Sequence, residues 1–409
     1  MRNLNLFLFP LCIFLSLFFC SCSKDEDLSQ EEQIPNIPLL SEGEKAERLF
    51  FLYIVADNNL SSNAQSDLSE LLSVSDEIPN NCYVLAFVDD NRGPRILRYF
   101  NNAGKGDYDT VHNFEREMAS CNPVDMQLVF NWVEEYYPAD NVDIVFWSHG
   151  TGWLYDDDNR VLEQFSFGAD NNVGVHTGKK RMYIEELASV LKSLKVKPDR
   201  ILFDACFMQC VEVAYALRDC ANWIIASPAE IPAPGAPYNI ILPLYFDSSV
   251  GVQSIIDAYK AAYDGSPTGV VLSAVRCNAL QQLADATAVV RAALMNISGS
   301  DCCDIFSYLP GGPSVLKPNF FDMNSVMQKF LSKEDYAAWK KALDNVVPFK
   351  CASEKWYSEV LDRDKGESGD DCYVKTANSY SGISMYLPSV DLIFNSSFAL
   401  LEWSRAVWE

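Results

Sequence analysis

The stretch VDIVFWSHG, residues 142–150, ends an apolar run in a histidine and a glycine. A second stretch, RILFDAC, residues 200–206, ends a similar run in a cysteine. Each run has the length and the β-branched or aromatic content of a buried strand. Because ligands bind at the carboxyl ends of the strands in parallel α/β sheets, we expect His149 and Cys206 at one edge of one sheet. A histidine base beside a thiol is the pairing that nucleophilic catalysis by cysteine requires.

Strands and helices alternate on both sides of these two stretches. We predict further strands at residues 50–55, 83–88, 95–100, 223–226, 270–275 and 382–388, with 95–100 at an edge of the sheet. We predict helices at residues 67–74, 123–137, 183–194, 207–218, 252–263, 279–294 and 397–407. This alternation favours an α/β fold with a parallel sheet and right-handed crossovers. Residues 151–181 have neither periodicity and are predicted to form a surface loop.

The position of the cysteine in the predicted elements favours reactivity. The predicted helix begins at the thiol of Cys206, and a helix amino terminus lowers the pKa of a thiol. Backbone amides at such a position can also bind an oxyanion, and Gly150 lets another backbone approach closely. The alternative is a buried structural cysteine together with a histidine of the core. Two strand-end motifs in one predicted sheet favour catalysis over that alternative.

Composition excludes several other kinds of site and partner. A chain of 409 residues with 49% apolar residues can bury a large core, and its net charge of −24 argues against nucleic-acid binding. The same charge is compatible with cationic substrates. The three histidines and thirteen cysteines have no spacing typical of a zinc site, so no metal site is expected among them. A chain of this size needs no disulfide framework, and most cysteines are expected to be buried free thiols.

The first residues of the chain predict export. Residues 6–20 are almost continuously apolar, a length typical of a signal-peptide core rather than of a transmembrane helix. The sequence CSCS, residues 20–23, resembles a bacterial lipoprotein signal with Cys22 as the lipidated residue. The acidic residues that follow resemble the export tag of surface lipoproteins in Bacteroides-type bacteria. The alternative is a plain secretory signal.

These observations predict three segments. Residues 1–21 are expected to be a lipoprotein signal peptide, and residues 22–48 an acidic disordered tether. Residues 49–409 are expected to form the folded domain, which the lipid would anchor at the outer membrane or cell surface.

Around both strand ends the sequence resembles the clostripain family of cysteine peptidases, in the clan of caspases, gingipains and legumains. The resemblance rests on SHGTGW (148–153), FDACFM (203–208), VEVAY (211–215) and GISMYLP (382–388). It implies an endopeptidase with a caspase-like α/β/α sandwich around a mostly parallel sheet. It also implies that His149 is the base, that Cys206 is the nucleophile, and that the amides of Gly150 and Cys206 bind the oxyanion.

The resemblance further implies a preference for Arg or Lys before the cleaved bond in protein or peptide substrates. Asp204 would recognise the basic side chain through a charge-assisted hydrogen bond. The alternative role for Asp204 is a structural carboxylate that caps the next turn. Residues 231–238 lack the further acidic residue that relatives often carry there, and Glu230 is the candidate substitute.

Members of this family are often activated by self-cleavage between the histidine and the cysteine. The expected cleavage follows Lys179, Lys180 or Arg181, with Arg160 as the second choice. No cofactor is expected to be required; the resemblance allows a calcium ion, for which residues 156–158 supply carboxylate oxygens. The alternative function is that of a non-catalytic surface lipoprotein that binds peptide or glycan on the same fold.

Overall fold

The computed structural model describes residues 44–154, 167–171, 182–309, 320–359, 361–362, 372–390 and 395–409. All of them belong to one compact unit, Asn36–Glu409. The predicted lipid site at Cys22 and the signal peptide lie outside the described residues, as does most of the predicted tether. In the part of the chain that is described, no helix is long and apolar enough to cross a bilayer.

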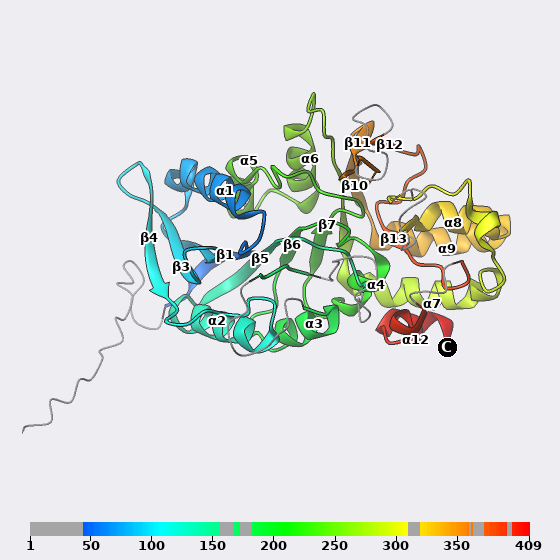
Figure 1. Ribbon diagram of the computed structural model, residues 1–409, viewed down its shortest axis with the longest axis horizontal. Helices are drawn as coiled ribbons and strands as arrows, with labels where there is room; N and C mark the ends of the chain where they lie inside the picture. Colours follow the sequence, from blue (N-terminus) through cyan, green and yellow to red (C-terminus); the bar gives the residue numbers. More distant parts are fainter. Residues whose placement is uncertain are drawn as a thin grey trace, which may run out of the picture. The chain divides into compact units, whose positions relative to one another are not determined.

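A nine-stranded sheet forms the centre of this unit, in the order β10-β8-β7-β6-β5-β1-β2-β3-β4 (Figure 1). Strands β2, β1, β5, β6 and β7 run parallel to one another, and the strands outside them pair antiparallel. The bounds are β1 Ala46–Val55, β2 Cys82–Asp89, β3 Arg95–Asn101, β4 Gly106–Asn113, β5 Ala139–Trp147, β6 Arg200–Asp204, β7 Trp223–Ala226, β8 Val271–Arg276 and β10 Phe349–Ala352.

Two of our expectations about the sheet are wrong. The strand at 270–275 exists as β8, but it runs antiparallel to β7 instead of extending the parallel set. Burial on both faces makes a strand apolar and carries no information on its direction. The strand at 95–100 exists as β3, but β4 covers it and takes the edge. The polar residues of β4, which include Asp107 and Asp109, are typical of an exposed edge strand.

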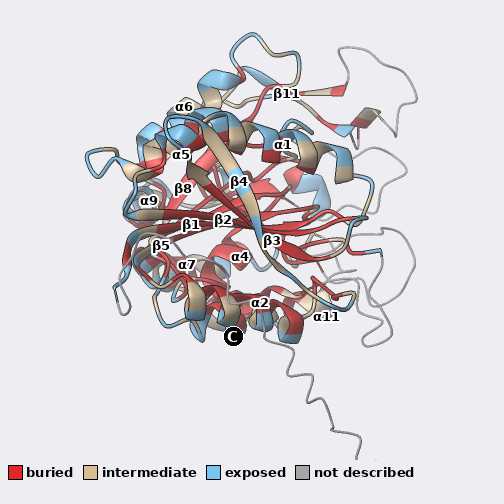
Figure 2. Cartoon of the chain, turned by 90° about the vertical axis from the view of Figure 1, so that its left-hand side faces the viewer, coloured by how far each residue is buried: buried red, intermediate tan, exposed pale blue. Residues whose placement is uncertain are grey.

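Helices cover both faces of the sheet. One face is covered by α1 (Ser61–Ser73), α5 (Tyr238–Phe246) and α6 (Val252–Ala262). The other face is covered by α2 (Pro123–Tyr136), α3 (Ile184–Lys192), α4 (Val211–Ala216) and α7 (Leu280–Val290). Figure 2 shows buried residues along the central strands and on the inward sides of the helices, while β4 is intermediate or exposed. The architecture is therefore an α/β/α sandwich.

Local sequence explains where α2 begins and which face it buries. The side chain of Asn122 accepts a hydrogen bond from the amide of Val124, and Pro123 occupies the first turn. Met126, Val129, Phe130 and Val133 follow at helical spacing, and all four are buried against the sheet. This helix has the bounds that the sequence predicted to within one residue.

The C-terminal part of the chain adds smaller elements to this sandwich. The predicted strand at 382–388 is reduced to β13, which pairs with β9 in a separate two-stranded sheet. The predicted helix at 397–407 is split into α11 and α12. The bounds are β9 Phe321–Asp322, α8 Met323–Phe330, α9 Lys333–Val346, β11 Lys355–Tyr357, β12 Tyr373–Lys375, β13 Ser384–Met385, α11 Asn395–Phe398 and α12 Glu402–Trp408. Short 3₁₀ turns occupy Ser75–Glu77, Cys277–Ala279, Arg291–Ala293 and Gly299–Cys302.

A buried ion pair joins the middle of β5 to the first residue of β6. Arg200 donates from Nε to Oδ1 of Asp143 at 2.6 Å and from a terminal guanidinium nitrogen to Oδ2 at 2.8 Å. Arg48 of β1 donates to the same carboxylate at 2.6 Å. Removal of one partner from such a buried cluster leaves an uncompensated charge. The cluster therefore holds the three central strands in one register.

Candidate active site

The two strands that lead to His149 and Cys206 end at the same level of the sheet. Trp147 of β5 pairs with Asp204 of β6, and the amide of Ser148 continues the ladder to the carbonyl of Asp204 at 3.4 Å. His149 and Cys206 each lie two residues beyond that pair. The register thus brings both residues to the carboxyl edge of adjacent parallel strands, where α/β folds bind ligands.

The imidazole of His149 is oriented by an asparagine from the loop after β1. Its Nε2 lies 2.7 Å from Oδ1 of Asn59. Because an amide oxygen can only accept, Nε2 carries the hydrogen and Nδ1 keeps the lone pair. Burial lowers the pKa of His149, and the carboxylate of Glu359 opposes this effect. The neutral imidazole that a general base requires is therefore the favoured form.

The helix expected to begin at the thiol does not begin there. Helix α4 starts at Val211, and Cys206 lies in a turn before it. Burial, followed by the charge of Glu230, raises the pKa of Cys206 to about 12, and the amide of Ile231 opposes this by donating to Sγ at 3.3 Å. The expectation of a thiol pKa lowered by a helix terminus is wrong. The thiol is neutral at rest, so a base must remove its proton.

The backbone just after Cys206 explains why no helix begins there. Phe207 has a φ of 61°, in the left-handed region that non-glycine residues rarely adopt. Its amide donates to the carbonyl of Ala229 at 2.9 Å, and its ring stacks on Phe320 with 4.8 Å between centroids. The amide of Gln209 donates to Ser227 in the same way. Tertiary contacts thus override the helical pattern of residues 207–210.

Gly150 allows the two strand ends to approach closely. A Cβ at this position would lie 2.7 Å from the carbonyl oxygen of Cys206 and 3.0 Å from Cβ of Ala205. In the described part of the chain, neither the amide of Gly150 nor that of Cys206 donates to a carbonyl. Both amides therefore keep the capacity to bind an oxyanion.

Asp204 lies on the sheet face that α1, α5 and α6 cover. It is buried, and its Oδ2 accepts from the amide of Ala236 at 2.8 Å and from the hydroxyl of Tyr238 at 2.9 Å. Gly235, with a φ of 64°, lies so close that a Cβ there would be 2.7 Å from Oδ2. Burial raises the pKa of Asp204 to about 6 although both hydrogen bonds lower it. Glu230 is half-buried, and its charge raises the pKa of the Cys206 thiol.

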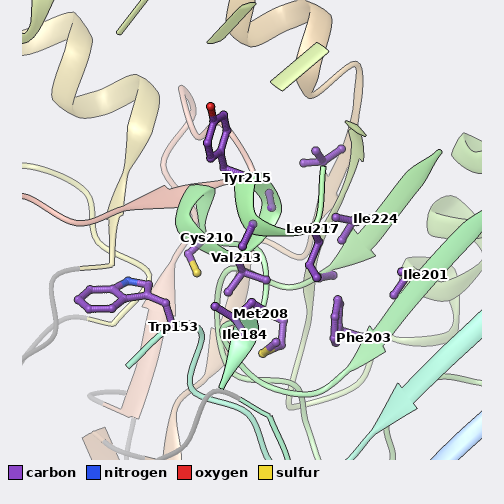
Figure 3. Packing of buried hydrophobic residues seen from close by; sticks show 14 of the residues in the cluster. Trp153, Ile184, Ile201, Phe203, Met208, Cys210, Val213, Tyr215, Leu217 and Ile224 are labelled. Carbon is purple, nitrogen blue, oxygen red and sulfur yellow. The ribbon is translucent and has the colours of Figure 1, made fainter. Parts of the chain in front are cut away.

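The segment between His149 and Cys206 is only partly a surface loop. Trp153, Leu154, Phe167 and Asp170 are buried, so the surface-loop interpretation is wrong for these residues. Figure 3 shows Trp153 within the packed cluster that also holds Cys210 and Met208. The predicted cleavage positions Arg160, Lys179, Lys180 and Arg181, and the acidic residues 156–158, lie outside the described residues.

Metal ligands and disulfides do not contribute to the described part of the site. Among the described residues, no group of three or more His, Cys, Asp and Glu is placed to hold a metal ion. The ten described cysteines are free thiols, and most are buried, as expected.

Two side chains of functional interest were missed by the sequence reasoning. Asn59 follows β1, and the rule that strand ends meet at one edge would have placed it beside His149. Asp67 lies on the buried side of α1 with Ala64, Leu68 and Leu71. An acidic residue within an apolar helical stripe was the available signal.

Similarity to known proteins agrees with this geometry. The family model for clostripain matches residues 52–388. Clostripain of Hathewaya histolytica is 24% identical over 246 residues, which cover 54% of this chain and 45% of that protein. The chain therefore spans less than half the length of this curated relative.

Two solved structures share the fold over almost their whole length. One is a secreted C11 cysteine protease from Bacteroides thetaiotaomicron in complex with an irreversible peptide inhibitor, with a TM-score of 0.75, 28% identity, and coverage of 88% of this chain and 99% of that chain. The other is an inactive zymogen C11 protease from Parabacteroides distasonis, with a TM-score of 0.73, 27% identity, and coverage of 90% and 99%. The predicted caspase-like sandwich is confirmed. The chain belongs to the clostripain family of cysteine peptidases.

Proposed function

We propose that the protein is an endopeptidase that cleaves peptide bonds after Arg or Lys, with Cys206 as nucleophile and His149 as base. The observation that carries the proposal is the register of β5 and β6, which brings both residues to one edge two positions beyond the pair Trp147 and Asp204. Acyl transfer to a thiol needs this pairing and no cofactor.

The reaction begins with transfer of the Cys206 proton to Nδ1 of His149, because the thiol is neutral at rest. The hydrogen bond to Asn59 keeps Nε2 occupied and the ring in place. The thiolate attacks the substrate carbonyl, and the amides of Gly150 and Cys206 stabilise the oxyanion. His149 then protonates the leaving amine, and water hydrolyses the acyl-enzyme with the same histidine as base.

Specificity for a basic side chain would come from Asp204, with Glu230 as a second carboxylate near the thiol. A carboxylate that meets a guanidinium in a dry pocket forms a strong, directional contact. The position of Asp204 supports this role, because Asp204 is the last residue of β6 and precedes Cys206 by two residues.

We further infer that self-cleavage after Lys179, Lys180, Arg181 or Arg160 activates the chain. The similarity to an inactive zymogen from Parabacteroides distasonis supports this inference. A calcium requirement would involve residues 156–158, and activity with and without a chelator tests it.

The proposed location is the outer membrane or cell surface, through lipid on Cys22. A secreted relative from Bacteroides thetaiotaomicron supports export. Replacement of Cys22 by Ala should release the protein from membranes or stall its processing, and unchanged membrane association with normal processing would contradict the anchor.

Fluorogenic peptides with Arg, Lys or Ala before the reporter group test the main proposal. We expect turnover of the Arg and Lys peptides and covalent labelling of Cys206 by an arginyl chloromethyl ketone. A folded, processed protein with neither turnover nor labelling would instead favour the non-catalytic binding of peptide or glycan.

A further inference from the structure

A second buried carboxyl lies beside Asp204, and it comes from helix α1. Asp67 is 2% exposed, and its Oδ2 accepts a hydrogen bond from the indole Nε1 of Trp147 at 2.7 Å. Trp147 is the register partner of Asp204, and paired residues of parallel strands point to the same face of the sheet. The indole therefore holds Asp67 against the carboxyl proposed to bind the basic side chain.

The groups around these two carboxyls are acidic or neutral. The neighbours that act on the pKa of Asp67 are Asp204, Glu70 and Trp147, and none of these carries a positive charge. Asp204 is also faced by the amide of Ala236 and the hydroxyl of Tyr238. Two buried carboxylates without a cation are strongly unfavourable, so the pair must hold either a proton or a cationic ligand.

Two tyrosines, Tyr259 of α6 and Tyr263 directly after this helix, provide an independent sign that the site can take a ligand. Tyr259 is 1% exposed, and its hydroxyl forms no hydrogen bond of normal geometry with another described residue. It nevertheless faces Asp204 closely enough to act as a weak donor that lowers the pKa of that carboxyl. The hydroxyl of Tyr263 donates to the carbonyl of Gly235 at 2.6 Å, and its pKa is raised by burial and by Asp204, Asp67 and Glu70. A buried hydroxyl without a well-formed hydrogen bond keeps the capacity to bind a further polar group.

The protonation of the pair follows from its burial. Burial and then Asp204 raise the pKa of Asp67 to about 9, while burial raises the pKa of Asp204 to about 6. The titratable groups that face the pair come from four segments. They are Glu70 on α1, Tyr238 on α5, Tyr259 on α6 with Tyr263 directly after it, and the thiol of Cys206 at the strand edge. Because both shifts favour the protonated form, the pair keeps a proton when no cation is bound.

We propose that Asp67 is a second specificity-determining carboxyl of the pocket that contains Asp204, and that an entering guanidinium or ammonium group displaces the proton the two carboxyls share. The proton leaves to solvent, and the cation takes its place between two carboxylates. No covalent bond changes in this exchange. The inference rests on the proposed function, because it assumes that Asp204 receives the basic side chain.

Replacement of Asp67 by Asn tests the inference. Asn keeps an acceptor for the indole of Trp147 but cannot ionise. We expect the ratio of kcat/KM for an Arg peptide to that for an Ala peptide to fall about tenfold or more, mainly through KM of the Arg peptide. Asp76→Asn, which removes one negative charge from an exposed position after α1, is the matched control and should keep the wild-type ratio.

The outcomes separate the two proposals. A wild-type enzyme without preference for Arg or Lys would overturn the proposed specificity and the inference with it. A wild-type preference that a folded Asp67→Asn variant retains would overturn the inference alone. A purely structural role for Asp67 would lower the thermal stability of the variant and leave the Arg-to-Ala ratio unchanged.

A measurement on the wild-type protein keeps the inference testable if the variant does not fold. Benzamidine is a small cation that competes with a basic side chain, and its binding can be followed by calorimetry in buffers of different ionisation enthalpy. We expect benzamidine binding to release protons at pH 7, since the pair holds a proton beforehand. Binding without proton release would contradict the shared proton.

Discussion

The Nε2 atom of His149 donates a hydrogen bond to Oδ1 of Asn59 across 2.7 Å, although ninety residues separate the two in the chain. Asn59 belongs to the loop between β1 and α1, and β1 is the neighbour of β5 in the sheet. The strand that precedes the histidine and the strand that precedes its partner are thus adjacent. The orientation of the His149 imidazole is a direct product of the strand order.

Replacement of Asn59 by Ala should lower kcat about 10- to 100-fold, because the imidazole loses the contact that fixes its tautomer and its direction. Steady-state kinetics on an Arg peptide measure the effect, and KM should change much less. Asn131→Ala, an exposed amide on α2, is the control. A variant at Asn59 with wild-type kcat would show that the ring is oriented by other contacts.

Replacement of Cys206 by Ala should abolish hydrolysis and labelling while the protein stays folded, since the nucleophile acts as a unit with its base. Cys303→Ala removes an exposed thiol and should retain full activity. Circular dichroism and peptide turnover on the same samples distinguish loss of chemistry from loss of fold. Near-full activity in Cys206→Ala would refute the assignment of the nucleophile.

Replacement of Asp204 by Asn should reduce the preference for Arg over Ala. A guanidinium left poorly paired in a buried pocket costs about 2–5 kcal/mol. The amide of Ala236 and the hydroxyl of Tyr238 can still donate to the Asn oxygen, which favours retention of the fold. The ratio of kcat/KM values decides the question, and an unchanged ratio would make Glu230 the next residue to replace.

The Asp67 carboxyl should make the folded state less stable as the pH rises. Its pKa is raised from 3.8 to about 9, so between these values the folded state binds more protons than the unfolded state. The free energy of unfolding therefore decreases with rising pH across this window. In the Cys206→Ala background, the melting temperature of the Asp67→Asn variant minus that of its parent should increase from pH 5 to pH 9. A constant difference across that range would show that the carboxyl does not titrate there.

Purified wild-type protein should be cut between His149 and Cys206, after Lys179, Lys180 or Arg181 first and Arg160 second. Mass spectrometry beside the Cys206→Ala protein, which should remain intact, locates the cut. Substitution of all four basic residues by Gln should leave a single chain of low activity. Full activity in a chain that is intact from 150 to 205 would show that cleavage is not required.

The parallel core of the fold could be predicted from the sequence because its strands are buried on both faces. Strand β7 has the bounds that its apolar run indicated, and β5 and β6 each end two residues before the predicted reactive side chain. Helix α5 was missed. It follows a Pro-rich segment that is typical of a loop, and it contains Pro243 in its interior.

The remaining differences concern features that a local pattern does not encode. The direction of β8 depends on how the chain returns after α5 and α6. The left-handed backbone at Phe207 depends on contacts with Ala229 and Phe320, which are distant in sequence. The pairing of His149 with Asn59 and of Trp147 with Asp67 likewise requires the strand order, which alternation alone leaves open.

Strands β5 and β6 are adjacent and are joined by the ion pair of Asp143 and Arg200. Cleavage of the chain between these strands would therefore leave two fragments that share one sheet. The fragments would stay together through the sheet, but their reassembly after denaturation would become a bimolecular step. Stability would then depend on protein concentration. Dilution of a denatured, cleaved sample would leave its two fragments apart under conditions in which the uncut chain refolds. The mature form would be protected by slow unfolding rather than by its capacity to fold again.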